Sequence, residues 1–135
     1  MTGDQLFSNS KLHKQVVNTL VFNEKYDCMV STDSGGMIEY WRPDESFQKP
    51  DTEDLWKFKS STDLYQIKKA RSTAVSSTLS PDNSKIAFFT IPDRQIRIFT
   101  FLTGKLWREY DENLNLATEM QQVKQRCLIY IIFIK

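Results

Sequence analysis

Short runs of β-branched and aromatic residues, separated by polar turns, fill the first part of the chain. Residues 16–22 (VVNTLVF) and 27–32 (DCMVST) are separated by the polar stretch NEK and predict two adjacent antiparallel strands. The small polar cluster 32–36 predicts a turn, and residues 37–41 (MIEYW) predict a third strand. Three strands with short connections predict a meander.

The pair Gly35-Gly36 within that turn could either hold a phosphate group or simply reverse the chain. A phosphate-binding glycine loop lies between a strand and a helix N-terminus, because the helix amides bind the anion. Here the glycines precede a predicted strand, and no Lys-Ser/Thr pair follows Gly36. The pattern therefore favours a hairpin turn.

A second meander follows a long polar segment. Residues 42–54 carry two prolines and several acidic side chains, which predict an exposed loop. Residues 56–58 (WKF) predict a short strand, and in residues 64–75 the helix and strand patterns compete. Beyond them the sequence predicts four strands joined by short turns: 75–79, 85–90, 95–101 and 106–110.

The two halves of the chain repeat each other. Setting Trp41 against Phe99 aligns GMIEYW with RQIRIF, and the turn and hairpin before each strand align as well. The offset exceeds the ~40–45 residues of a propeller blade, and the loop at 42–54 accounts for the excess as an insertion. Repeated units of three or four short strands predict an all-β fold of radially arranged sheets.

These residues resemble a known family. His13, the strand ending in Trp41, and the stretch TLSPDNSKIAFFTIPDRQIRIFTFLTGKLWREYDE resemble WD repeats. More narrowly, SSTDLYQIKKA, SGGMIEYW and FLTGKLWREYDENLNLATEMQQ resemble the WD-repeat region of nuclear cyclophilins that carry a peptidyl-prolyl isomerase domain behind their propeller. The resemblance implies a β-propeller fragment of about two blades plus part of a third in residues 1–112. We expect residues 113–135 to hold a short helix and an apolar tail.

WD blades are similar in using a histidine, a turn aspartate, a Ser/Thr and a tryptophan to lock each sheet by hydrogen bonds. The resemblance implies four structural positions here: His13, Trp41, Asp93 and Phe99. Neither unit has the complete set, because Gly35 aligns with Asp93 and Phe99 replaces the tryptophan. We therefore expect apolar packing to dominate, and Asp93→Ala to cost more stability than Asp33→Ala.

Composition and charge narrow the range of possible functions. Eighteen basic and seventeen acidic residues give a net charge of +1, so no overall field favours nucleic acid or an anionic membrane. The two cysteines lie far apart, and no cluster has metal-ligand spacing, so we expect no metal and no cofactor. The apolar run at 128–134 is too short to cross a bilayer. That run and the open sheet edges favour self-association of the isolated chain.

Few residues in the sequence indicate a catalytic function. His13 is the single histidine, so any nucleophile activated by histidine would have to use it, and a structural role is favoured. We therefore expect a non-catalytic WD-repeat scaffold that binds protein partners. The resemblance implies the spliceosome, pre-mRNA splicing and the nucleus, with direct RNA contact disfavoured because acidic residues are interspersed among the basic ones. The alternative is a truncated peptidyl-prolyl cis-trans isomerase whose cyclophilin domain is missing from the chain.

Overall fold

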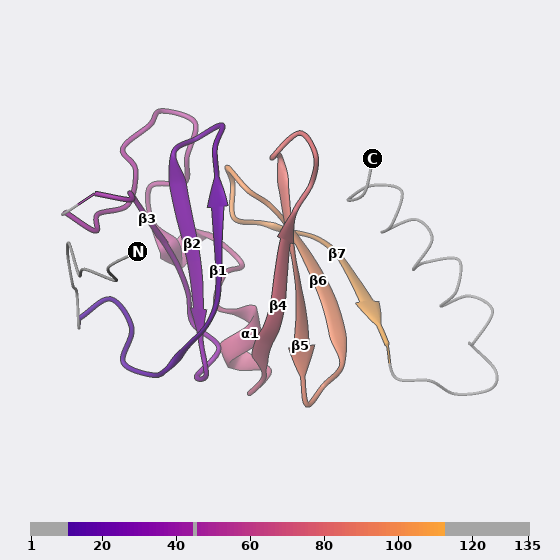
Figure 1. Ribbon diagram of the computed structural model, residues 1–135. Helices are drawn as coiled ribbons and strands as arrows, with labels where there is room; N and C mark the ends of the chain where they lie inside the picture. Colours follow the sequence, from indigo (N-terminus) through magenta and orange to yellow (C-terminus); the bar gives the residue numbers. More distant parts are fainter. Residues whose placement is uncertain (1–10, 45, 113–135) are drawn as a thin grey trace, which may run out of the picture.

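The computed structural model describes residues 11–44 and 46–112, which form two antiparallel sheets (Figure 1). The first sheet has the order β1-β2-β3, with β1 Val17–Asn23, β2 Cys28–Asp33 and β3 Ile38–Trp41. The second has the order β4-β5-β6-β7, with β4 Thr73–Leu79, β5 Lys85–Ile91, β6 Gln95–Thr100 and β7 Leu106–Asp111. Each strand pairs with its neighbour in the chain, so both sheets are meanders.

The two sheets repeat each other in detail. The first strand of each sheet has a register irregularity near its start, between Val17 and Thr19 in β1 and between Ala74 and Ser76 in β4. The all-β prediction is confirmed at this level, because the described residues hold little helix and no closed barrel. Two sheets do not by themselves make a propeller. The helix and apolar tail expected within residues 113–135 lie outside the described residues.

The connection between the sheets differs from the prediction. Residues 56–58 form no strand, although the Trp56 amide donates to the Leu102 carbonyl at 2.8 Å. A 3-10 turn, Lys59–Ser61, and the short helix α1, Gln66–Lys69, follow. Ile67 of α1 is completely buried, so the undecided pattern at 64–75 resolves into one helical turn followed by β4.

The turn between β4 and β5 is stabilised by residues that are close in sequence. Between β4 and β5, Asn83 has a φ of 63°, in the left-handed region that asparagine tolerates. The Asp82 carboxylate accepts hydrogen bonds from the Ser80 hydroxyl at 2.7 Å and the Ser84 amide at 3.0 Å. These bonds from Ser80 and Ser84 hold the pKa of Asp82 well below its usual range.

The two sheets share one hydrophobic core. The first sheet contributes Cys28, Val30, Ile38 and Tyr40, the second contributes Ala74, Ile86, Phe88 and Phe99, and Phe101 comes from the turn after β6. The Tyr40 ring stacks on that of Phe101 with centroids 4.7 Å apart, and its hydroxyl donates to the Phe101 carbonyl at 3.0 Å. Apolar burial of this kind stabilises by roughly 1.5–3 kcal/mol per large side chain, so neither sheet is independent of the other.

The first strands of the two sheets are neighbours (Figure 1). The Asn18 amide donates to the Thr73 hydroxyl at 2.7 Å, and that hydroxyl donates to the Asp33 carbonyl at 3.0 Å. At the other end of β1, the Asn23 amide donates to the Asn83 carbonyl at 3.1 Å. Side chains rather than a backbone ladder therefore join β1 to β4, and the remaining strands extend away from this contact.

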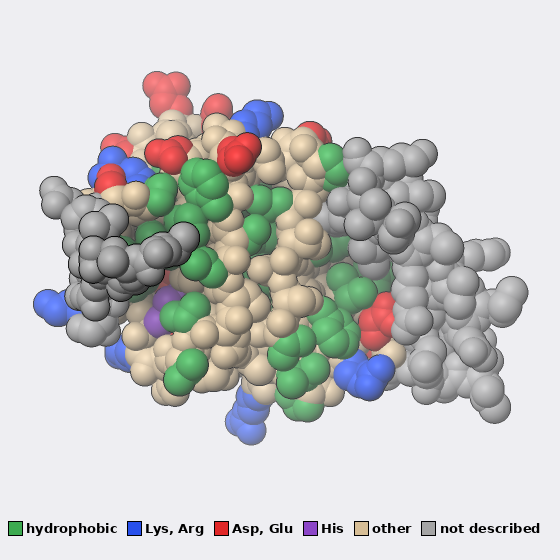
Figure 2. Space-filling view, viewed as in Figure 1, with side chains coloured by type: hydrophobic (Ala, Val, Ile, Leu, Met, Phe, Trp, Pro, Cys, Tyr) green, Lys and Arg blue, Asp and Glu red, His purple; other side chains and the backbone are tan. Residues whose placement is uncertain are grey.

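Each sheet also has an outward face with exposed apolar side chains, some of which colour the surface green in Figure 2. On β1 these are Val17, Leu20 and Phe22, and on the second sheet they are Val75, Ile91 and Trp107. The shared core uses one face of each sheet, and the other face of the second sheet also buries a smaller cluster of Ala87, Ile98 and Tyr110.

Candidate functional site

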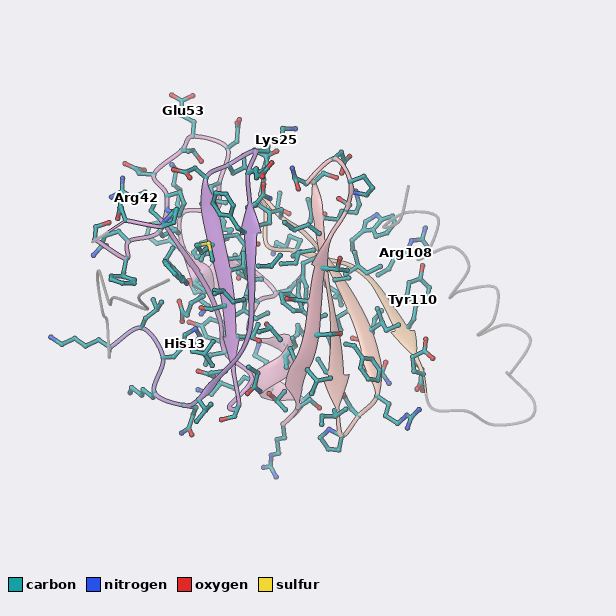
Figure 3. The ribbon with its side chains drawn as sticks, in the orientation of Figure 1. His13, Lys25, Arg42, Glu53, Arg108 and Tyr110 are labelled. Atoms are coloured by element: carbon teal, nitrogen blue, oxygen red, sulfur yellow. The ribbon has the colours of Figure 1, made fainter. Side chains whose placement is uncertain are left out.

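Four side chains form a hydrogen-bonded chain: Trp41, Ser31, His13 and Asp33. Figure 3 labels His13 beside the first sheet. The Trp41 indole N–H donates to the Ser31 Oγ at 3.0 Å. The same Oγ lies 2.6 Å from Nε2 of His13, and Nδ1 of His13 lies 2.8 Å from Oδ2 of Asp33. The His13 and Asp33 side chains are 5% and 2% exposed, so water does not compete for these bonds.

One arrangement of protons satisfies every member of this chain. The indole nitrogen can only donate, so Ser31 accepts from Trp41, and in this arrangement its own hydroxyl proton is directed to Nε2 of a neutral His13. The imidazole then carries its proton on Nδ1 and donates to the Asp33 carboxylate. The network therefore ties β2, β3 and the segment before β1 together.

Asp33 also organises the turn after β2. Its Oδ1 accepts hydrogen bonds from the amides of Gly35 at 2.9 Å and Met37 at 3.1 Å. The sequence alignment assigned the aspartate position to Gly35, but the structure puts the carboxylate of Asp33 in that role. The first unit thus has a full set of four polar groups, and Ser31 and Asp33 are the members that sequence reasoning missed. Ser31 and Asp33 lie two residues apart at the end of the predicted strand 27–32, and this position is the sequence feature that could have identified them.

Ser31, His13 and Asp33 have the connectivity of a catalytic triad, but their surroundings do not allow its chemistry. A nucleophilic serine must reach a substrate carbonyl. Ser31 is 2% exposed and its Oγ already accepts the Trp41 N–H. The expected structural role of His13 thus fits the geometry better than a role as general base.

The second sheet has a different polar network, centred on Arg97. This side chain is 6% exposed and donates through all three nitrogens: Nε to Glu109 at 3.0 Å, Nη1 to Thr90 at 2.8 Å and Nη2 to Asp93 at 2.7 Å. The Thr90 hydroxyl donates to the other oxygen of Asp93 at 2.6 Å. Three donors in a fixed fork suit two carboxylates and a hydroxyl, so an arginine bridges β5, β6 and β7.

The structure separates the two sequence-predicted positions of the second unit. Asp93 belongs to the Arg97 network, whereas Phe99 lies in the apolar core, edge-on to Phe88 with ring centroids 5.8 Å apart. Partial burial alone would raise the pKa of Asp93, but the hydrogen bonds from Thr90 and Arg97 outweigh it and lower that pKa. His13 and Trp41, by contrast, meet in one network.

The remaining buried titratable groups do not make a reactive site. Burial raises the pKa of the Cys28 thiol to about 12, so at neutral pH it is a protonated core group rather than a thiolate nucleophile. Burial likewise raises the pKa of Tyr40 above its ordinary value. Among residues 11–44 and 46–112, no three His, Cys, Asp or Glu side chains gather as a metal site would require. Within this part of the chain no helix is both long and apolar enough to cross a membrane.

Comparison with known proteins shows which proteins the chain resembles in sequence. No protein-family model matches the chain. It is 47% identical over 120 residues to "Peptidyl-prolyl cis-trans isomerase cyp15" of Rhizopus delemar, and 42% identical over 117 residues to the human "Peptidylprolyl isomerase domain and WD repeat-containing protein 1". The chain is thus similar to part of proteins that are named peptidyl-prolyl isomerases. The alignments cover 89% and 86% of the chain but 19% and 18% of these relatives, about a fifth of their length.

Two further comparisons agree with the fold and with this relationship. "Peptidyl-prolyl cis-trans isomerase 9" of Schizosaccharomyces pombe is 40% identical over 117 residues, which is 87% of the chain and 19% of that protein. The crystal structure of the computationally designed Ika8 protein matches 73% of the chain and 25% of its own chain with a TM-score of 0.50 and 20% identity. At that identity the designed protein informs the fold alone.

The relatives correct the functional prediction. We expected a non-catalytic WD-repeat scaffold in the spliceosome, and a chain that is not an enzyme. Both predictions are wrong, because relatives that align with nearly 90% of the chain are named peptidyl-prolyl cis-trans isomerases. The alternative given above, a truncated peptidyl-prolyl cis-trans isomerase whose cyclophilin domain is missing from the chain, is the prediction that the names of the relatives favour. The prediction rested on the resemblance to a WD-repeat region and on the lack of a recognisable cyclophilin segment beyond it.

Proposed function

We propose that the chain is a segment of a peptidyl-prolyl cis-trans isomerase, and that the protein containing it interconverts the cis and trans forms of X-Pro bonds in other polypeptides. The observation that carries this proposal is the identity of 40–47% to isomerases over nearly the whole chain. Because the chain spans about a fifth of those relatives, we assign the activity to the whole protein.

We further propose that this segment is the WD-repeat part of such an isomerase. Two successive antiparallel sheets with neighbouring first strands suit radially repeated blades. The hydrogen-bonded set of His13, Ser31, Asp33 and Trp41 has the composition by which WD blades are locked. The name of the human relative includes both an isomerase domain and WD repeats.

The proposed reaction forms and breaks no covalent bond. Rotation about a peptide bond has a barrier of ~18–20 kcal/mol, and the uncatalysed X-Pro isomerisation takes roughly 10–100 s. An isomerase lowers this barrier by binding the twisted peptide more tightly than either planar form. The reaction therefore needs neither a metal nor a strong nucleophile.

An assay of the native protein tests the proposal. Antibodies raised against the purified chain would capture that protein from its own cells, and the captured protein would be added to a proline-containing peptide whose isomerisation is followed by NMR exchange. We expect faster exchange than in buffer. Capture in the presence of excess free chain is the control, and it should abolish the acceleration. Exchange at the uncatalysed rate, with the captured protein verified by mass spectrometry, would overturn the proposal.

The nuclear location stays a proposal that rests on the resemblance alone. The same antibodies would test it by immunofluorescence, with the free chain again as the blocking control. Staining confined to the cytoplasm would contradict it.

A further inference from the structure

A hollow of about 340 Å³ lies beside the β2–β3 turn, between that turn, the segment before β1 and the helix α1. Three lysines from two of these segments line it: Lys11, Lys14 and Lys68. Gly35 lines it as well, and a Cβ there would already lie 3.3 Å from both the Gln15 side chain and Oδ1 of Asp33. The absence of a side chain at this position thus keeps the hollow open.

The carboxylates that line the hollow are already engaged. Glu39 accepts from Nζ of Lys59 at 2.7 Å. Asp33 is bonded to His13 and to the turn amides. In contrast, Lys14 and Lys68 make no ion pair with any residue that the structure describes. Positive charge is therefore left over in the hollow, although the chain as a whole is close to neutral.

The rest of the lining is aliphatic. Leu12 and Met37 are both half-buried at its wall, and no aromatic ring belongs to the described lining. Binding of single-stranded RNA without sequence preference normally uses aromatic rings on which the bases stack. A polypeptide needs no such ring, because its carboxylates pair with lysines and its apolar side chains contact aliphatic groups.

We propose that this hollow binds an acidic segment of a partner protein, with its carboxylates on Lys14 and Lys68 and an apolar side chain against Leu12 and Met37. The inference does not rest on the proposed isomerase function, since only the charge and shape of the hollow carry it. A site of this size accommodates a few side chains, so the interaction is of the short linear-motif kind.

Fluorescence anisotropy with the full 135-residue chain tests this inference. The probe is a short fluorescein-labelled peptide of alternating glutamate and leucine at low ionic strength. We expect saturable binding that the double variant Lys14→Glu/Lys68→Glu weakens by about a hundredfold, or roughly tenfold per lysine. Lys69→Glu/Lys105→Glu is the matched control, because it makes the same charge change on two exposed lysines outside the hollow and should bind as the wild type does.

Each other outcome would overturn the inference. Equal weakening in both double variants would mean non-specific attraction, and an absence of saturable binding to the wild type would mean no site. Tighter binding of labelled oligouridylate than of the peptide, with the same dependence on Lys14 and Lys68, would make the hollow an RNA surface instead. Lys14→Gln/Lys68→Gln, checked by circular dichroism, repeats the test without charge reversal in case the glutamate variant fails to fold.

Discussion

Asp33 and Asp93 both join strands through charged hydrogen bonds, but their surroundings differ. The Asp33 side chain is 2% exposed and Asp93 is 23% exposed. Removal of Asp33 leaves His13 and two turn amides without their acceptor, whereas removal of Asp93 leaves Arg97 still bonded to Glu109 and Thr90. From these contacts we expect the opposite order of stability losses from the one that the sequence predicted.

We expect Asp33→Ala to lower the free energy of unfolding by about 3 kcal/mol and Asp93→Ala by about 1.5 kcal/mol, since unpartnered buried groups cost most. Urea denaturation followed by circular dichroism measures both changes. Asp44→Ala, at an exposed loop position, is the control and should change little. A larger loss for Asp93→Ala would show that the Arg97 network, not that of His13, is the stronger lock.

The lowered pKa of Asp93 also predicts a pH dependence. A carboxylate whose pKa is lower in the folded state stabilises the fold above its unfolded pKa, here 3.8, and this stabilisation is lost as the pH falls toward the folded value. We expect Asp93→Asn to be less stable than the wild type at pH 6 and to lose less additional stability below pH ~4. Parallel melting curves for both proteins across that acid range would contradict the assignment.

At the scale of elements, the structure shows why the turn between β2 and β3 needs a glycine at position 36. Gly36 has a φ of 86°, and a Cβ there would lie 2.6 Å from the Ser72 carbonyl oxygen and 2.9 Å from the Lys68 backbone. The glycine therefore lets the β2–β3 turn approach the link between α1 and β4. Its role is close packing of backbone, as well as chain reversal.

We expect Gly36→Ala to destabilise the fold by about 3 kcal/mol or more, because it combines a left-handed backbone with a collision against main-chain atoms. Gly35→Ala is the matched control and should cost under about 1 kcal/mol, since its neighbours can move by a few tenths of an ångström. Thermal unfolding of the two variants distinguishes them. Similar melting temperatures would mean that the turn does not pack against α1.

The strands were predictable from the sequence because their alternation and turn residues act locally. Predicted boundaries lie within two residues of β1 to β7. The connection between the sheets was not predictable, since Trp56 and Ile67 are fixed by the core of both sheets rather than by their neighbours in sequence. The polar networks were only partly predictable. A gap-free alignment placed Gly35 where Asp33 acts, and no local pattern distinguishes the buried Arg97 from the exposed basic residues near it in sequence.

At the scale of the whole molecule, we expect the exposed apolar side chains of both sheets to affect the oligomeric state of the isolated chain. Leu20 is 58% exposed and Val75 is 45% exposed. We expect the purified chain to self-associate reversibly at micromolar concentration, and Leu20→Glu to shift it toward the monomer, because charge on an apolar face opposes burial. Analytical ultracentrifugation measures the shift. Thr78→Glu, at an exposed polar position of β4, is the control, and a monomeric wild type would contradict the expectation.

Hydrogen exchange in a Phe88→Leu variant tests most directly whether the two sheets form one folded unit around a shared core. Phe88 belongs to β5, yet it lies in the same buried cluster as Val30 and Ile38 of the first sheet. We predict that the substitution lowers the protection of amides in β2 and β5 by the same free energy, since both strands open only when the whole core opens. Loss of protection confined to the second sheet would show two independently folding sheets and would contradict the account.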